Sequence, residues 1–297
     1  YGGSKPGVYT RNTLTETKNA TYGLDVQKDI SLSEKSLLTV GANAKKEKYE
    51  PQIIKGDSAK SSDKKERNQF AVFAQLDQKF TDKDNLIIGG RGTWTSGSTN
   101  GEEYDDFSAS AQYVHKFNED KSVYISVGQS FIMPSFSQMY PSGVAAGAPN
   151  PNLKPQKGTN YELGYKEIAG NHLWKVALFK MNVKDNITAS WKNEVWNYKN
   201  TDFKNVGLEA SLAVDASDKF SYDIGLTVHN PKNKIENEPS KKGWQRKFGK
   251  YQVKSGVEYK LDKFRAGFSG SYVWDRYSSP SSKESYKIKP YFLTTFT

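Results

Sequence analysis

The sequence predicts an all-β protein whose antiparallel strands form a transmembrane β-barrel, and three observations support this prediction. Apolar residues make up only 35% of the 297 positions, whereas aromatic residues reach 13% and glycine occurs 24 times. Candidate strands alternate apolar and polar side chains with a period of two residues, as half-buried strands do. Short and long connections tend to alternate along the chain, as expected when short turns lie at one rim of a barrel and long loops at the other.

Composition narrows the ways in which this chain can meet a membrane. No stretch of about 18 consecutive apolar residues is present, so a helical membrane span is excluded. A closed barrel then remains as the way to cross a bilayer, because it satisfies every backbone polar group. One face of its wall meets lipid and the other meets water, which accounts for a low apolar content with many Tyr, Trp and Gly. Cysteine is absent, so neither a disulfide framework nor a thiolate metal site is expected.

The alternating segments predict about thirteen strands. They are expected near 20–28, 36–46, 67–80, 85–96, 104–117, 121–133, 158–168, 172–190, 194–215, 218–230, 244–259, 263–276 and 284–297. Ile125 and Leu208 fall on apolar faces and are expected to meet lipid, whereas Ser126 falls on the opposite face and is expected in the lumen. A soluble antiparallel sheet would alternate in the same way, so the strand pattern alone leaves both classes open.

The connections separate these two classes. Short polar turns are expected at 81–85, 118–121, 169–171, 216–219 and 260–264, and longer loops at about 47–66, 134–157, 231–243 and 277–284. Outer-membrane barrels have this asymmetry, with short periplasmic turns and long extracellular loops, whereas a soluble sandwich has no reason to show it. The connections therefore favour the membrane barrel.

Charge and motifs exclude other functions. The formal net charge is +10, but 43 basic residues are mixed with 33 acidic ones in hydrophilic stretches such as 55–67 and 229–247, so a nucleic-acid partner is not expected. The only histidines are His115, His172 and His229, and none lies in a metalloprotease or Cys/His motif. No P-loop, dinucleotide fingerprint or nucleophile elbow is present. We therefore expect no enzyme, no catalytic residue, no resident metal and no cofactor.

Residues 126–166 closely resemble the signature region of TonB-dependent receptors. The matching elements are Phe131 with Pro134, the Asn-Pro-Asn-Leu-x-Pro run at 150–155 and the Tyr-Glu-x-Gly-Tyr strand at 161–165. Further elements follow in the family's order at 180–187, 205–212, 269–277 and 286–295. The sequence is thus identified as a member of this family, which implies a bacterial outer-membrane location and transport as the function.

The resemblance also implies a domain organisation and partners. Residues 1–297 correspond to part of the receptor barrel, and the plug domain and last strands of the family have no counterpart, so we expect an incomplete barrel, from a complete one of about 22 strands. The implied partners are the TonB energy-transducing complex, reached through the missing plug, a metal-chelate ligand, and the lipid and lipopolysaccharide of the membrane. The expected cargo is a ferric siderophore or a similar chelate. A haem or cobalamin receptor of this class, and a non-energised porin or adhesin barrel, stay open as alternatives.

Ligand contact is expected from aromatic and basic residues on the extracellular rim, because rigid aromatic rings bind large, partly apolar ligands at low entropic cost. The candidate residues are Phe136, Met139, Tyr140, Trp191, Trp196, Tyr198, Trp244 and Arg91. Haem receptors pair the Asn-Pro-Asn-Leu element with a histidine in the loop before it, and residues 135–149 contain none. We interpret Pro134, Asn150, Pro151 and Pro155 as shaping the loop ends, and Tyr161, Tyr165, Trp174 and Trp274 as anchors at the membrane interfaces.

Overall fold

A computed structural model describes residues 13–55, 58–61, 63–97, 103–142, 147–235, 243–278 and 286–297. Within these ranges, the side chains of 13–15, 52–55, 58–61, 191–192 and 235 are not described. No helix in the described part of the chain is long and apolar enough to span a membrane.

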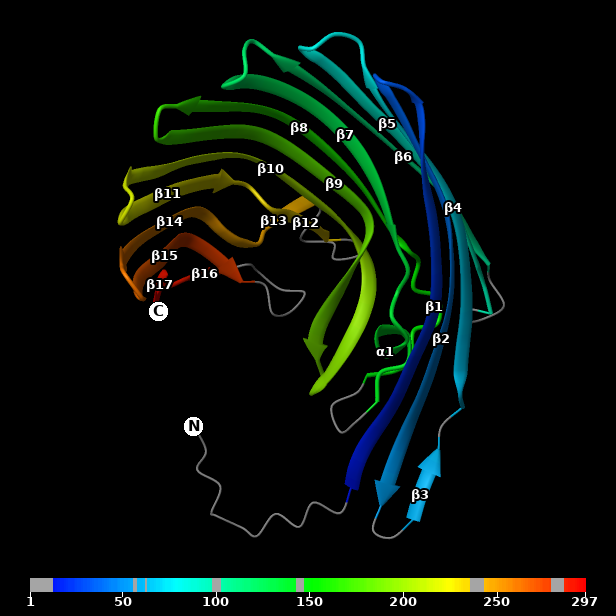
Figure 1. Cartoon of the computed structure of the whole chain (residues 1–297). Coiled ribbons are helices and arrows are strands. Elements are labelled where there is room, and N and C mark those ends of the chain that lie inside the picture. Colours follow the sequence, from blue (N-terminus) through cyan, green and yellow to red (C-terminus); the bar gives the residue numbers. More distant parts are fainter. Residues whose placement is uncertain are drawn as a thin grey trace.

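One antiparallel sheet contains all of the described strands, and it curls into an open barrel (Figure 1). The wall strands are β1 (Thr13–Ser33), β2 (Ser36–Lys55), β4 (Lys65–Lys79), β5 (Asp84–Ser96), β6 (Tyr104–Lys116), β7 (Lys121–Ile132), β8 (Gln156–Ala169), β9 (His172–Lys192), β10 (Val195–Ser217), β11 (Phe220–His229), β14 (Phe248–Leu261), β15 (Phe264–Ser278) and β17 (Tyr291–Phe296). Short strands extend the wall at one end: β3 (Ser58–Ser61), β12 (Lys232–Ile235), β13 (Gly243–Arg246) and β16 (Tyr286–Ile288). One helical turn, α1 (Phe136–Met139), lies on the concave side (Figure 1).

The wall strands pair in chain order, each with the next. Among the described residues, β1 and β17 do not pair with each other, so the barrel is open between them. The sequence prediction of an incomplete antiparallel barrel with about thirteen wall strands is confirmed.

Cross-strand register shows which face each side chain occupies, because directly opposed residues point to the same side of a sheet. Ile125 lies opposite Leu163, which continues the row to Leu178 and Leu208. Ser126 belongs to the alternate rows, which carry Glu162 and face the concave side where α1 lies. Ile125 and Leu208 thus lie on the convex face and Ser126 on the concave face.

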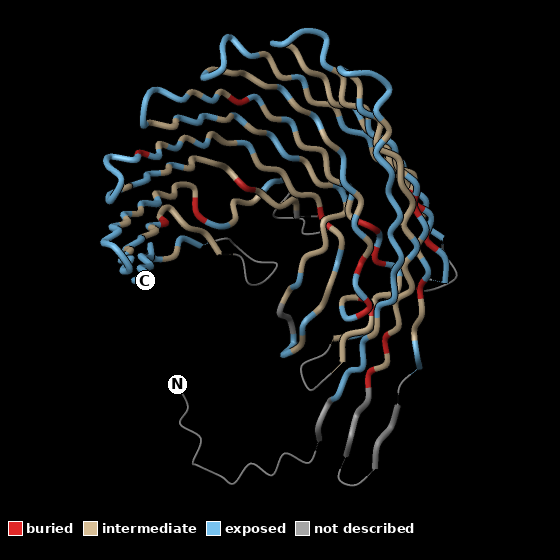
Figure 2. The backbone as a smooth tube through the Cα atoms, viewed as in Figure 1, coloured by how far each residue is buried: buried red, intermediate tan, exposed pale blue. Residues whose placement is uncertain are grey.

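Few side chains are buried, and large apolar ones point outward instead. Ile125 is 58% exposed and Phe107 is 70% exposed, and Figure 2 shows that buried residues are scattered patches in a wall of intermediate and exposed residues. Monomeric soluble proteins rarely expose so many large apolar side chains side by side. The convex face is therefore suited to lipid.

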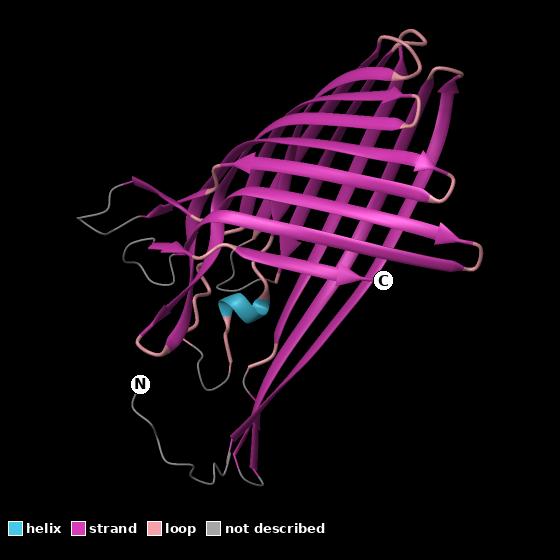
Figure 3. Cartoon of the chain, turned by 90° about the vertical axis from the view of Figure 1, so that its left-hand side faces the viewer, coloured by secondary structure: helices cyan, strands magenta, loops and turns pink. Residues whose placement is uncertain are grey.

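Short turns join the strands at one end of the barrel (Figure 3). They consist of 34–35, 80–83, 117–120, 170–171, 218–219 and 262–263. Side-chain oxygens replace missing backbone partners in several of them: Thr81 Oγ1 accepts the backbone N–H groups of Lys83 and Asp84, and Asn118 Oδ1 accepts that of Lys121 at 2.8 Å. Such turns need Thr, Asn, Asp and Ser at these positions, which is why the sequence pattern located them.

The opposite end differs from the sequence prediction in two places. A loop was expected over 47–66, but β2 continues to Lys55, because its backbone pairing with β1 runs on to that residue and β3 pairs with its last four residues. The second place is the loop expected at 231–243, where β12 forms a short strand that pairs with β10. The β9–β10 connection agrees with the prediction, because a tight turn at Asn193 and Glu194, both with positive φ, joins the two strands.

Candidate functional site at the mouth of the barrel

The connection between β7 and β8 is described at residues 133–142 and 147–155, which turn inward across the end of the barrel opposite the short turns (Figures 1 and 3). We call it the mouth segment. It begins with α1, whose N-cap is Ser135: Ser135 Oγ accepts the Gln138 backbone N–H at 3.3 Å, and Gln138 Oε1 accepts the Ser135 backbone N–H at 2.9 Å. This capping box satisfies backbone groups that a single helical turn would otherwise leave unpaired.

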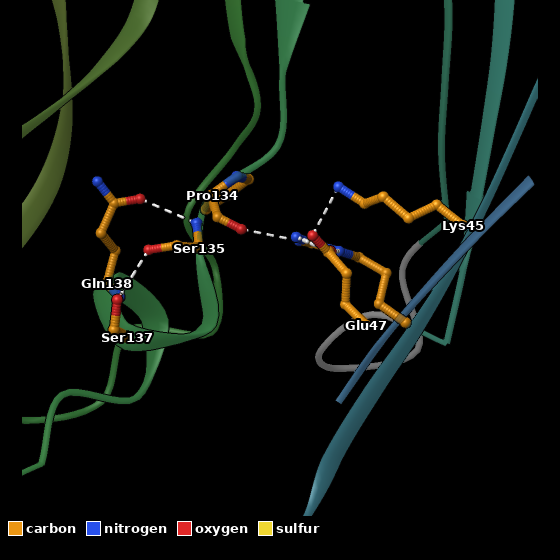
Figure 4. A network of polar contacts seen from close by, with 7 residues as sticks. Lys45, Glu47, Pro134, Ser135, Ser137 and Gln138 are labelled. Atoms are coloured by element: carbon orange, nitrogen blue, oxygen red, sulfur yellow. Dashed lines mark hydrogen bonds and ion pairs between the residues drawn. The ribbon is translucent and has the colours of Figure 1, made fainter. Parts of the chain in front are cut away.

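Arg67 of β4 anchors the start of the mouth segment to the wall. Its Nη1 donates to the Pro134 carbonyl at 2.7 Å, and its Nε donates to Glu47 Oε2 at 2.6 Å (Figure 4). Lys45 forms a second ion pair with Glu47, at 2.7 Å. Arg67 is only 5% exposed, so its charge depends on these partners.

The Glu47 carboxyl titrates abnormally because of this network. Burial on its own would raise its pKa, but hydrogen bonds and positive charge from Lys45 and Arg67 outweigh it, and the pKa of Glu47 is held below its usual range. Its charged form therefore persists at neutral pH and keeps the guanidinium in place.

Aromatic contacts reinforce this first anchor. The Tyr49 ring stacks on Phe136 with centroids 5.8 Å apart, and the Arg67 guanidinium lies 4.9 Å from the centre of the Phe136 ring. Tyr49 Oη also donates to the Tyr140 carbonyl at 2.9 Å. Both ends of α1 are thus fixed to β2 and β4.

The second half of the mouth segment is held by the β9–β10 hairpin. The Gly147 N–H donates to the Trp196 carbonyl at 3.0 Å, and Asn150 Nδ2 donates to the Tyr198 carbonyl at 2.9 Å. The Lys154 N–H donates to Asn200 Oδ1 at 2.8 Å.

Asn200 joins three parts of the chain. Its Nδ2 donates to the Lys154 carbonyl at 2.9 Å and to the Asp185 carbonyl at 2.7 Å, where β9 has a left-handed residue with φ of 54°. The mouth segment consequently connects the β2–β4 wall to the β9–β10 hairpin across the concave side.

A cavity of about 420 Å³ lies between the mouth segment and strands β1, β2 and β4. Its lining combines charged, hydrogen-bonding and apolar groups with more cations than carboxylates, including Lys45, Lys48, Arg67, Glu47, Tyr49 and Phe131. A volume of this size is within the range of small-molecule sites, and this mixture suits a ligand with anionic and aromatic parts.

The structure buries three of the predicted contact residues to different degrees. Phe136 is 6% exposed and Met139 is fully buried, so in this conformation both pack within the mouth segment. Tyr140 is half-buried, and Lys65 Nζ lies 4.8 Å from the centre of its ring. Leu153 and Pro134 are also fully buried, which supports a structural role for this sequence motif.

The other predicted contact residues lie on four strands. Trp196 and Tyr198 lie on β10 where the mouth segment docks, and Trp196 is 46% exposed. Trp191 pairs with Trp196 through the backbone, but its side chain lies outside the described residues. Arg91 lies on the concave face of β5, 5.9 Å from the centre of the Phe73 ring, and Trp244 on β13 lies 3.9 Å from Lys204 Nζ. In the described part of the chain, these ring contacts of Arg91 and Trp244 are with wall strands β4 and β10 and not with the mouth segment.

The sequence did not identify Arg67, Glu47, Tyr49 or Asn200 as site residues. The first three follow the inward alternation of β2 and β4, but they lie at positions where a loop or a strand start was expected. Continuing that alternation past residue 46 would have placed Glu47 and Tyr49 inward, facing the lumen.

The three histidines lie near the ends of wall strands. His115 and His172 are beside short turns, whereas His229 ends β11 at the opposite end and its Nδ1 is 3.1 Å from Asn205 Nδ2. Within the described residues, no group of three or more His, Cys, Asp or Glu side chains is arranged to hold a metal ion.

A lipid-suited wall, short turns on one rim and an inward mouth segment on the other define a membrane-spanning barrel of the outer-membrane type. The whole chain, residues 1–297, matches the family model described as TonB dependent receptor-like, beta-barrel. The chain therefore belongs to this family, whose members are outer-membrane transporters and not enzymes.

Solved structures show the same fold. The chain is similar to the copper transporter OprC, with a TM-score of 0.75 and 14% identity over 95% of this chain and 48% of that one. It is similar to the FrpB iron transporter from Neisseria meningitidis, with a TM-score of 0.71 and 16% identity over 94% and 48%. The ferric yersiniabactin uptake receptor FyuA from Yersinia pestis gives 0.68 and 16% over 96% and 47%. The chain thus spans about half the length of these structures.

Proposed function

We propose that this chain forms part of the barrel of a TonB-dependent transporter that admits a ferric siderophore or a similar metal chelate. In this proposal, a plug domain outside the present sequence contacts the TonB complex and moves to let the chelate pass. The mouth segment and the β9–β10 hairpin form the extracellular receptor surface.

One observation carries the choice of cargo: aromatic and cationic side chains converge at the mouth. Lys45, Arg67 and Tyr49 line the 420 Å³ cavity, and Trp196 and Tyr198 lie on the hairpin to which the mouth segment docks. An anionic chelate that carries its own iron ligands needs such an outer contact surface. The structural neighbours include iron, ferric siderophore and copper transporters, which supports a metal-bearing cargo.

The test uses the complete receptor in a strain that lacks its other iron receptors. Radioactive iron uptake is measured with a panel of ferric siderophores, with haemin and with cobalamin as competitors. Replacing Tyr140 and Trp196 together by Ala should weaken chelate uptake about tenfold or more, because aromatic anchors tend to dominate such contacts. His229→Ala should leave uptake largely unchanged, because its imidazole pairs with Asn205.

The same experiment distinguishes the haem alternative. Haemin-dependent growth that is lost in the His229→Ala variant alone would overturn the siderophore proposal. If every probe is still taken up after TonB is removed, the protein is a non-energised pore instead.

A further inference from the structure

Strands β6 and β7 are neighbours in the wall (Figure 1), but their halves toward the mouth are not joined by a backbone ladder. The two strands pair only as far as Ser110 with Gly128, and residues 104–109, all of them described, have no partner in the described residues 129–132. Over these same segments β6 stays paired with β5, and β7 stays paired with β8. We call this unpaired stretch, 104–109 beside 129–132, the seam.

Side-chain contacts join the seam in place of the missing ladder. Gln129 Oε1 accepts the Ala109 backbone N–H at 3.0 Å, so a side-chain amide replaces the main-chain carbonyl that a ladder would supply. Lys157 Nζ forms an ion pair with Asp106 Oδ1 at 2.8 Å. Because Lys157 belongs to β8, this ion pair passes the end of β7 and ties β6 to the second strand along the wall.

The Asp106 carboxylate depends on this ion pair. Its side chain is only 9% exposed, and its Oδ2 accepts the Ser108 hydroxyl at 2.6 Å. The Lys157 side chain is 52% exposed, and its Nζ also lies 5.6 Å from the centre of the Phe131 ring. A buried carboxylate that loses its cation is strongly unfavourable. Without Lys157, Asp106 would therefore be more stable in water, which it reaches if the seam parts.

The mouth segment starts at the seam, because it connects Ile132 at the end of β7 to Gln156 at the start of β8. Its hydrogen bond from Arg67 to the Pro134 carbonyl attaches it to β4, which lies on the β6 side of the seam. This hydrogen bond crosses the seam on the concave side and limits how far it can part. Parting itself breaks no backbone hydrogen bond of the β6–β7 ladder, because that ladder ends at Gly128.

We propose that the seam is a hinge at which the wall parts between β6 and β7 toward the mouth, with the Asp106–Lys157 ion pair holding it closed. The continuous ladder from Ser110 and Gly128 to the short turns keeps the rest of the wall shut. The base of the mouth segment moves with β7 and β8, so parting widens the mouth. A role of this widening in the entry of a chelate rests on the proposed function, whereas the hinge itself does not.

The test is a distance measurement by double electron–electron resonance on the complete receptor in lipid nanodiscs, without cargo. Spin labels at Ser96→Cys on β5 and Lys199→Cys on β10 are exposed and lie on opposite sides of the seam, and this chain has no native cysteine to interfere. Lys157→Gln and, independently, Gln129→Ala should each add a population that is longer by about 5 Å, one strand spacing, or more. The heat-modifiable mobility of each variant on gels checks that its barrel is folded.

Lys121→Gln is the matched control, because Lys121 forms an ion pair of similar length, 2.9 Å, with Glu167 where β7 and β8 are fully paired. It should leave the distance distribution unchanged. Distances that stay unchanged in both seam variants would overturn the hinge. An equal lengthening in Lys121→Gln would overturn it as well, because the wall would then loosen wherever an ion pair is lost.

The role in transport is tested separately, with a disulfide across the seam. Ala109→Cys with Gln129→Cys holds the seam shut, and Ala111→Cys with Val127→Cys places the same bond one row lower, where the strands already pair. The first disulfide should slow chelate uptake about tenfold, with recovery in reductant, because a mouth that cannot widen delays entry. The second should have no effect. Equal uptake in both oxidised proteins would overturn the role in transport, while the distances still decide the hinge.

Discussion

At the scale of single residues, Arg67 shows how one buried charge positions a functional segment. A lysine would reach Glu47 or the Pro134 carbonyl, whereas the planar guanidinium reaches both and also lies over the Phe136 ring. Removing it leaves a half-buried carboxylate with only Lys45 as its partner. The position of α1 therefore depends on a side chain from a distant strand.

Arg67→Ala should destabilise the docked mouth segment by about 1–3 kcal/mol, the usual cost of leaving a buried polar partner unsatisfied. Limited proteolysis of the folded receptor should then cut within 133–155 faster, with the wall left intact. Adding Glu47→Gln to Arg67→Ala should not restore the docked segment, because the hydrogen bond to the Pro134 carbonyl stays lost and Lys45 also loses its ion-pair partner. A double variant that is cleaved as slowly as the unchanged protein would contradict this account.

Acid should have the same effect as removing the Glu47 charge. A carboxyl whose folded pKa is depressed contributes stability above its unfolded pKa and loses it as the pH falls through the folded value. Cleavage of the mouth segment should thus be constant at neutral pH and rise only below about pH 4.5.

At the scale of elements, the short connections were predictable from the residues that form their turns. The longer connections were hard to predict, because their positions depend on pairing between strands that are distant in the sequence. The sequence predicted strands at 172–190 and 194–215, and β9 and β10 agree closely because residues 193–194 interrupt the alternation. The extension of β2 to Lys55 was missed, because residues 47–55 show no regular alternation of apolar and polar side chains in the sequence. Long-range contacts such as Arg67 with Pro134 leave no local sequence signal at all.

Cysteine labelling tests which rim is extracellular, and the chain has no native cysteine to interfere. Glu194→Cys, at the exposed tip of the β9–β10 hairpin, should react with a membrane-impermeant maleimide on intact cells. Asp82→Cys, in an exposed short turn, should react only after the membrane is opened. Gly147 lies at the same rim, but a cysteine there is unsuitable because its Cβ would collide with the Trp196 carbonyl. The reverse labelling pattern would invert the topology.

At the scale of the whole molecule, the strand register places apolar rows on the convex face of the wall and polar rows on the concave face. The convex row through Tyr113, Ile125, Leu163, Leu178 and Leu208 is continuous across five strands, and the concave rows between carry polar groups. The alternation in the sequence predicted these faces correctly, since a barrel wall has a fixed period of two.

Ile125→Arg or Leu208→Arg should each reduce the free energy of folding into a bilayer by about 2–4 kcal/mol if the site is near the midplane. Ser126→Arg should be tolerated, because it faces the water-filled side. Folding yield into lipid vesicles, measured by the heat-modifiable gel shift, compares the three variants. Similar yields at all three positions would contradict the assignment of faces.

The outward-facing apolar side chains also explain why this architecture survives large divergence. In a soluble core, each side chain is confined by its neighbours, and a change in volume opens a cavity or causes a clash. Here the neighbour is fluid hydrocarbon, which flows into any space that a smaller side chain leaves. Leucine, valine and phenylalanine are then nearly interchangeable on the convex face, and the backbone ladder keeps its geometry. This freedom accounts for a TM-score of 0.75 at 14% identity, because side chains on the lipid-facing wall can change while the backbone fold is kept.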